Sequence, residues 1–177
     1  LGGLRGNKDA IAETIENNVR RTIIKEHLND PAYYEKMSAL LDEIITARKA
    51  KAIEYEQYLK RIAELAKKVE AGQAEDTPEP LKKSQALRAL YNNLKATHGV
   101  HMEVDRAAAT QTEYQTAHDP TLRVVLKINE AIRTVRHDGW RGVQTREQVI
   151  KQALYDVLRD EAEVERIFLI VKAQREY

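Results

Sequence analysis

The sequence predicts an all-α protein, folded as a multi-helix bundle of about six to eight helices. Its 177 residues include only seven glycines and four prolines, whereas these two residues together make up roughly 12% of an average chain. Residues that favour helices, namely Ala, Leu, Glu, Lys, Arg and Gln, dominate the composition instead. Apolar residues recur with helical spacing along most of the chain, and no strand-like alternation is long enough to build a sheet.

The first helix is expected over about residues 8–27, and a second helix from the pair Asp30-Pro31 onward. The first carries an apolar residue at every fourth position: Ile11, Ile15, Val19 and Ile23. At the start of the second, the Asp30 carboxylate can accept a bond from a first-turn amide, and Pro31 stands where no amide donor is needed. The expected buried face of this helix consists of Met37, Leu40, Leu41, Ile44 and Ile45.

A third helix is expected after a break between Lys49 and Glu54, because charged residues dilute the apolar stripe there. Its apolar set is Tyr55, Tyr58, Leu59, Ile62, Leu65, Ala66 and Val69. The segment 71–80 then contains two prolines and no apolar residue larger than alanine, which is typical of a linker. We therefore expect an N-terminal helical lobe over residues 1–70, a linker over 71–80 and a C-terminal helical lobe over 81–177. Packing of the whole chain as one domain is the alternative.

Two helices are expected in the first part of the C-terminal lobe. One covers about residues 81–97 and ends at Gly99, in the position that a left-handed cap favours. The other begins at Asp119-Pro120, which repeats the cap-plus-proline pattern, and reaches about His137. Their apolar stripes are Leu87, Leu90, Tyr91 and Leu94 for the first, and Leu122, Val125, Leu126, Ile132 and Val135 for the second.

Two more helices are expected to close the chain. Thr145-x-x-Gln148 and Asp160-x-x-Glu163 both have the spacing of a capping box, in which the first side chain accepts a bond from a first-turn amide. An apolar stripe follows each of them. The stripes consist of Val149, Ile150, Ala153, Leu154, Val157 and Leu158, and of Val164, Ile167, Phe168, Ile170 and Val171.

Charge and composition exclude several classes of function. The 29 basic and 28 acidic residues are spread evenly, so no part of the chain is a polyelectrolyte arm for nucleic acid. The absence of cysteine excludes disulfides, thiolate metal sites and thiol nucleophiles. Because the sequence has neither an apolar run of membrane length nor a signal-peptide pattern, we expect a soluble, cytoplasmic protein without a membrane partner.

The common catalytic motifs are missing from the sequence. The Walker phosphate loop, the His-Glu-x-x-His helix and the Gly-x-Ser-x-Gly elbow are all absent, and two serines leave no basis for a serine triad. His98, His101, Glu103 and Asp105 are ligand types that a divalent metal accepts. A polar loop after a helix end is the alternative for this stretch, and we expect no metal or cofactor site.

The spacing of Arg20 and Arg21 from His27 matches the loose Arg-x(4–6)-His pattern of helical ribonucleases of the HEPN class. There the arginine would stabilise an oxyanion and the histidine would move protons. With this many arginines, about one such match arises by chance. We therefore expect Arg21 to lie on the solvated face of the first helix, and a helical ribonuclease stays a further alternative.

A cationic cluster with a tryptophan follows the Asp119-Pro120 helix, and comprises Arg133, Arg136, His137, Trp140, Arg141 and Arg146. Three interpretations remain open. The cluster can hold carboxylates of a partner protein around an aromatic contact residue, or grip phosphates while the indole stacks on a base. In the third, Trp140 fills a gap between helices and the arginines are solvated. Because Gly139 and Gly142 flank Trp140, we expect a flexible turn from which the indole can protrude.

Several segments resemble the C-terminal helical region of the motor (R) subunits of type I restriction-modification enzymes. They are 10–24 (AIAETIENNVRRTII), 29–41 (NDPAYYEKMSALL), 55–59 (YEQYL), 63–66 (AELA), 138–142 (DGWRG) and 167–177 (IFLIVKAQREY). The segments keep the order that they have in that family and extend over nearly the whole chain, apart from 71–80 and 99–118.

The resemblance implies a non-catalytic helical domain that docks the nuclease and translocase subunit onto the methyltransferase and specificity subunits. ATP and Mg²⁺ would belong to the motor of the parent subunit, an ATP-dependent site-specific deoxyribonuclease, and no catalytic residue is carried over to this chain. The lack of an initiator Met at Leu1 fits a piece of such a subunit. The expected partner-binding residues are Trp140, Arg141, Arg136, Arg133 and Arg146. Weak DNA contact beside the motor is the alternative function.

Overall fold

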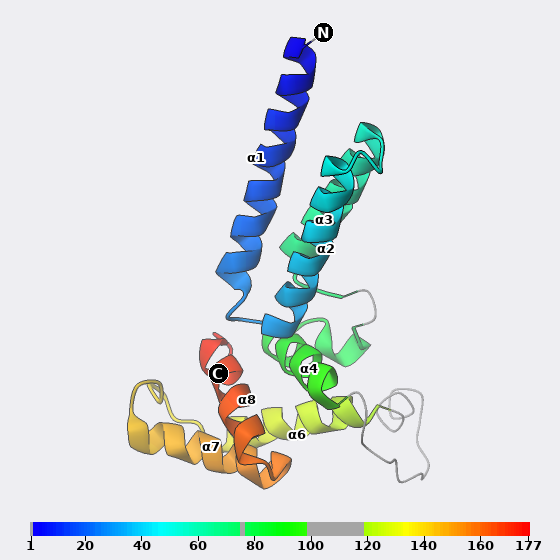
Figure 1. Ribbon diagram of the computed structural model, residues 1–177. Helices are drawn as coiled ribbons and strands as arrows, with labels where there is room; N and C mark the ends of the chain where they lie inside the picture. The colour runs from blue at the N-terminus through cyan, green and yellow to red at the C-terminus, as the bar shows by residue number, and fades with distance from the viewer. Residues whose placement is uncertain (1, 75–76, 99–118) are drawn as a thin grey trace. The chain divides into compact units, whose positions relative to one another are not determined.

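A computed structural model describes residues 2–74, 77–98 and 119–177 of the chain. Within these ranges the protein forms seven α-helices and one short 3-10 helix, and no strand (Figure 1). The prediction of an all-α fold is therefore confirmed. The chain divides into two compact units, unit 1 (Leu1–Glu75) and unit 2 (Asp76–Tyr177). None of the helices in the described ranges is both long and apolar enough to cross a lipid bilayer.

Unit 1 is a bundle of three mutually contacting helices, α1 (Gly2–Glu26), α2 (Pro31–Lys49) and α3 (Tyr55–Ala71). The break between α2 and α3 lies where the sequence predicts it. The first helix begins earlier than predicted, because α1 starts at Gly2 and not near residue 8.

The core of unit 1 contains most of the predicted apolar positions together with residues that the periodicity missed. The predicted stripe of α1 is wrong only at Ile11, which is 46% exposed while the adjacent Ala12 is fully buried. Val19 and Ile23 are buried as predicted, and Ile15 packs against the core. Tyr33 and Tyr34 are both buried. Their hydroxyls donate hydrogen bonds to backbone carbonyls at the end of α3, at 2.7 and 3.4 Å, which offsets the cost of burying them.

Unit 2 consists of a short 3-10 helix, η1 (Glu79–Leu81), and four α-helices: α4 (Gln85–His98), α6 (Pro120–Val135), α7 (Gln144–Leu158) and α8 (Glu161–Ala173). Contacts between α4 and α6, α6 and α7, α7 and α8, and α4 and α8 enclose one apolar core. The core includes Leu90, Leu94, Leu122, Ile128, Ile132, Ile150, Leu154, Ile167 and Phe168. The helix predicted from residue 81 begins later, because Ser84 accepts a bond from the Leu87 amide at the start of α4, at 3.1 Å.

Three of the four predicted helix starts have the expected side-chain cap. The carboxylates of Asp30, Asp119 and Asp160 each accept a bond from the amide three residues further on, at 3.3, 3.0 and 2.9 Å. These bonds satisfy amides that have no partner within the helix. The prediction of a capping box at Thr145 is wrong, because α7 begins at Gln144, with Val143 at the cap position and no side-chain cap bond.

Candidate functional site: the arginine-rich connection of unit 2

The connection between α6 and α7 has a fixed backbone geometry. Gly139 and Gly142 have φ angles of 65° and 78°, in the left-handed region that favours glycine. The amide of Gly142 donates to the Glu147 carboxylate at 2.7 Å, which ties the connection to the first turns of α7. The two glycines of the Asp-Gly-Trp-Arg-Gly segment therefore allow the chain to turn. This turn sets the directions of the two side chains between them, Trp140 and Arg141.

Trp140 points into the core of unit 2 and is only 2% exposed. Its ring lies 6.0 Å from the Phe168 ring, at an interplanar angle of 59°. The indole Nε1 donates to the Tyr177 carbonyl at 3.4 Å. The expectation that Trp140 protrudes for partner binding is therefore wrong. The same two glycines that suggested an exposed turn direct the indole into the core of unit 2.

Arg141 and Arg136 both hold backbone carbonyls at the C-terminal end of the described chain. Arg141 donates from Nε to the Lys172 carbonyl at 2.9 Å and from Nη2 to the Gln174 carbonyl, and its guanidinium lies 4.5 Å from the centre of the Trp140 ring. Arg136 donates from Nη1 to the Glu176 carbonyl at 3.2 Å. Desolvation lowers the pKa of Arg141, and the nearby charge of Arg136 lowers this pKa further.

Arg146 and Arg133 complete the predicted cluster. Arg146 donates from Nη1 to the carbonyls of Asp138 and Gly139 at 2.8 and 3.4 Å, and so stabilises the connection itself. Arg133 donates only to the side-chain oxygen of Asn129, at 3.2 Å, and is exposed.

The residues after α8 form a part of this site that sequence reasoning missed. Tyr177 is 4% exposed, its hydroxyl donates to Asn129 at 3.1 Å, and burial raises its pKa to about 12. The Glu176 carboxylate accepts bonds from the Ser84 hydroxyl and the Ala86 amide at the start of α4, at 2.5 and 3.0 Å. Ser84 and Glu176 lie 92 positions apart, so no local pattern could have revealed the contact.

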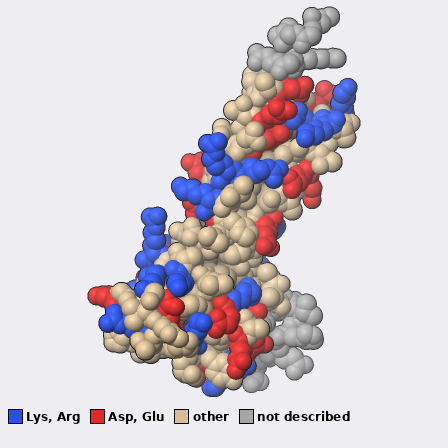
Figure 2. All heavy atoms as spheres, turned by 60° about the vertical axis from the view of Figure 1, so that its left-hand side comes forward, with Lys and Arg blue, Asp and Glu red and all other residues tan. Residues whose placement is uncertain are grey.

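We call Arg133, Arg136, Arg141, Arg146 and Arg175 the arginine surface. Within the described part of the chain, none of these arginines pairs with a carboxylate: four bond to carbonyl or amide oxygens, and Arg175 is exposed without a partner. On the face shown in Figure 2, basic and acidic side chains are interspersed. Guanidinium groups held in this way present their remaining N–H donors to oxyanions such as carboxylates or phosphates.

A pH-dependent ion pair supports the connection from α7. The Glu147 carboxylate receives bonds from Lys172, at 2.7 Å, and from the Gly142 amide, and these bonds lower its pKa below the ordinary value of 4.5. Because the folded-state pKa is lowered, this contribution to stability is present above the unfolded-state pKa and is lost as the pH falls through the folded-state pKa.

Replacing Glu147 with glutamine is therefore expected to lower the free energy of unfolding at neutral pH, with a difference from wild type that shrinks as the pH falls below 4.5. Urea titrations at a series of pH values measure this difference. Glu130, an exposed glutamate without an ion pair, provides the control variant Glu130→Gln. A difference for Glu147→Gln that is constant across the acid range would contradict the assignment.

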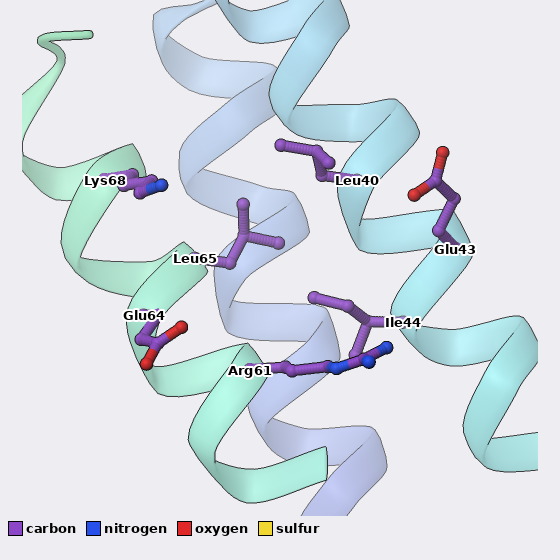
Figure 3. Close-up of a pocket in the computed structure, with 7 residues that line it drawn as sticks. All are labelled: Leu40, Glu43, Ile44, Arg61, Glu64, Leu65 and Lys68. Atoms are coloured by element: carbon purple, nitrogen blue, oxygen red, sulfur yellow. The ribbon is translucent and has the colours of Figure 1, made fainter. Parts of the chain in front are cut away.

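A groove of about 230 Å³ lies between α2 and α3 of unit 1. Figure 3 shows Leu40 and Ile44 of α2 facing Leu65 of α3, with the Arg61 side chain reaching toward Ile44. The groove is lined by Leu40, Glu43, Ile44, Arg61, Glu64, Leu65 and Lys68. Small-molecule sites usually have volumes of roughly 300–1,000 Å³, so this groove is too small and too open for a typical ligand site.

The other residues that the sequence suggested for function do not belong to the arginine surface. Arg20 pairs with Asp42 at 2.7 Å, and the His27 imidazole lies 3.6 Å from Glu35, so α2 supplies an acidic neighbour for each of them. Arg21 is exposed on α1. Residues 99–105 and the His98 side chain, which make up the metal-ligand candidate, lie outside the described residues, as does the Gly99 cap. Across the described ranges, no three His, Asp or Glu side chains are grouped to hold a metal ion.

No protein-family model, curated protein or solved structure matches this chain. The resemblance to type I restriction motor subunits therefore stays a prediction.

Proposed function

We propose that this chain is a non-catalytic helical docking domain of a type I restriction enzyme motor subunit. It would attach the nuclease and translocase subunit to the methyltransferase and specificity subunits, in defence against foreign DNA. The arginine surface is the observation that carries the docking role, and the choice of partners rests on the sequence resemblance. Backbone carbonyls hold the guanidinium groups of Arg136, Arg141 and Arg146, and all five arginines of the surface lack carboxylate partners in the described part of the chain. Surfaces of fixed arginines that become desolvated contribute strongly to protein interfaces.

The arginines, without Trp140, are the proposed contact residues. Trp140 supports them from within, because its indole lies beneath the Arg141 guanidinium. Since Arg136, Arg141 and Arg146 are already held by hydrogen bonds to carbonyls, docking costs less conformational entropy at these positions than it would for free arginine side chains.

DNA contact beside the motor is the second candidate, and the same observation favours it because arginine also binds phosphates. The two functions differ in their salt dependence. Affinity for DNA falls steeply with salt concentration, with a slope set by the number of phosphates contacted. The near-neutral chain, with 29 basic against 28 acidic residues, argues against strong binding to DNA by this chain alone.

Arg133→Glu tests the docking proposal. Arg133 is exposed and bonds only to Asn129, so charge reversal there is expected to preserve the fold. Recruitment to the methyltransferase and specificity subunits, measured by surface plasmon resonance, is expected to weaken about tenfold. The matched control is Arg61→Glu, at an exposed arginine of unit 1 without an ion pair. Equal recruitment of wild type and both variants would reject the arginine surface as the docking site.

A further inference from the structure

We propose that Arg136, Arg141 and Arg175 form a receptor for paired carboxylates on an acidic segment of a protein partner. The inference rests on the proposed docking function and names its contact chemistry. It names the contact chemistry at three arginines of the arginine surface, which surround one short segment, Lys172–Tyr177 in sequence.

Hydrogen bonds to backbone carbonyls hold two of these arginines in place. Arg141 binds the carbonyls of Lys172 and Gln174, and Arg136 binds the carbonyl of Glu176. Both guanidinium groups are thereby held against the same short segment, and Arg175 lies in sequence between the carbonyls that they hold. Arg136 uses one of its five N–H donors in these bonds and Arg141 uses two, which leaves donors on both for an external oxyanion.

The positive charges of the receptor are not balanced by a paired carboxylate of the described chain. Arg136 and Arg141 are close enough for the charge of Arg136 to lower the pKa of Arg141. Glu176, which follows Arg175 in sequence, does not neutralise them, because its carboxylate binds Ser84 and the Ala86 amide instead. Fixed like charges without a counter-charge favour the binding of an anion that bridges them.

Carboxylates of a protein fit this receptor better than the phosphates of DNA. Binding along DNA requires a track of cations that follows the phosphate backbone. Here basic and acidic side chains are interspersed on the face shown in Figure 2, and the 29 basic residues of the chain are nearly balanced by 28 acidic ones. Guanidinium groups fixed by the backbone match a small number of carboxylates in bidentate geometry.

Fluorescence anisotropy with the full chain tests the receptor. The probes are a fluorescein-labelled oligoglutamate peptide and a short labelled DNA duplex. Arg136→Gln and Arg175→Gln are each expected to weaken binding of the peptide about tenfold, because each loses charge-assisted hydrogen bonds. Arg136→Lys, which keeps the charge and loses the bidentate geometry, is expected to bind the peptide with intermediate affinity. Arg61→Gln is the matched control and is expected to bind like wild type.

Arg175→Gln keeps the test valid if Arg136→Gln perturbs the fold, since Arg175 has no intramolecular bond to lose. Peptide affinities that are equal in all variants, or an equal loss in Arg61→Gln, would overturn the receptor. Binding of the duplex in preference to the peptide, with loss in Arg136→Gln, would overturn it in favour of nucleic acid. Failure of the docking function is a separate result: the chain would not be recruited to the methyltransferase and specificity subunits, whatever its affinity for the peptide.

Discussion

Replacing Trp140 with alanine is expected to lower the free energy of unfolding of unit 2 by about 3–5 kcal/mol. The indole is 2% exposed, packs against Phe168 and donates to the Tyr177 carbonyl. Removing it leaves a cavity beneath the Arg141 guanidinium and releases the segment after α8. Urea titrations followed by far-ultraviolet circular dichroism measure the loss, because the variant lacks the only tryptophan of the chain.

Leu169→Ala is the matched control for this prediction. Leu169 lies on α8, next in sequence to Phe168, and is 66% exposed, so its removal is expected to change stability by less than about 0.5 kcal/mol. If Trp140→Ala destabilised the protein no more than Leu169→Ala, the indole would not be the core residue described above, and its role as a protruding contact would have to be reconsidered.

Glu16→Ala is expected to lower the free energy of unfolding of unit 1 by about 3 kcal/mol. The Glu16 carboxylate is 7% exposed and accepts two bonds from Arg48, at 2.8 and 3.3 Å. Arg48, 11% exposed, also lies 5.6 Å from the centre of the Tyr58 ring. Removing the acid leaves the guanidinium nearly buried without its main counter-charge. The bond from Glu16 and its charge raise the pKa of Arg48, in agreement with this pairing.

Two further variants separate the contribution of the buried Glu16–Arg48 pair from that of an exposed charge. Asp9 also bonds Arg48, at 3.0 Å, but is 70% exposed, so Asp9→Ala is expected to cost less than about 1 kcal/mol. Combining Glu16→Ala with Arg48→Met is expected to cost less than the sum of the two single changes, because no charge is then left without its partner. Strict additivity, measured in the same urea titrations, would show that the pair is not coupled.

Local signals in the sequence were sufficient to predict most of the helix positions. Proline after a capping aspartate marks the starts of α2 and α6, because both features act within one turn. The break before α3 and the stripe of α8 follow from the spacing of apolar residues, which reports burial along a single helix.

The candidate site depends on contacts that sequence spacing does not report. Trp140 is buried although glycines flank it, and its carbonyl partner Tyr177 lies 37 positions further on. The bond from Ser84 to Glu176 likewise connects the start of α4 to the segment after α8. Composition and periodicity describe one element at a time, so they identified the arginines of the site and did not show which oxygens those arginines bind.

Sedimentation velocity of the purified chain mixed with the methyltransferase and specificity subunits tests the central claim most directly. We expect the chain to sediment with these subunits, through a surface that Arg133→Glu weakens and Arg61→Glu does not. Sedimentation of the chain as a separate species, at concentrations where both components are intact, would contradict the claim that it works by docking.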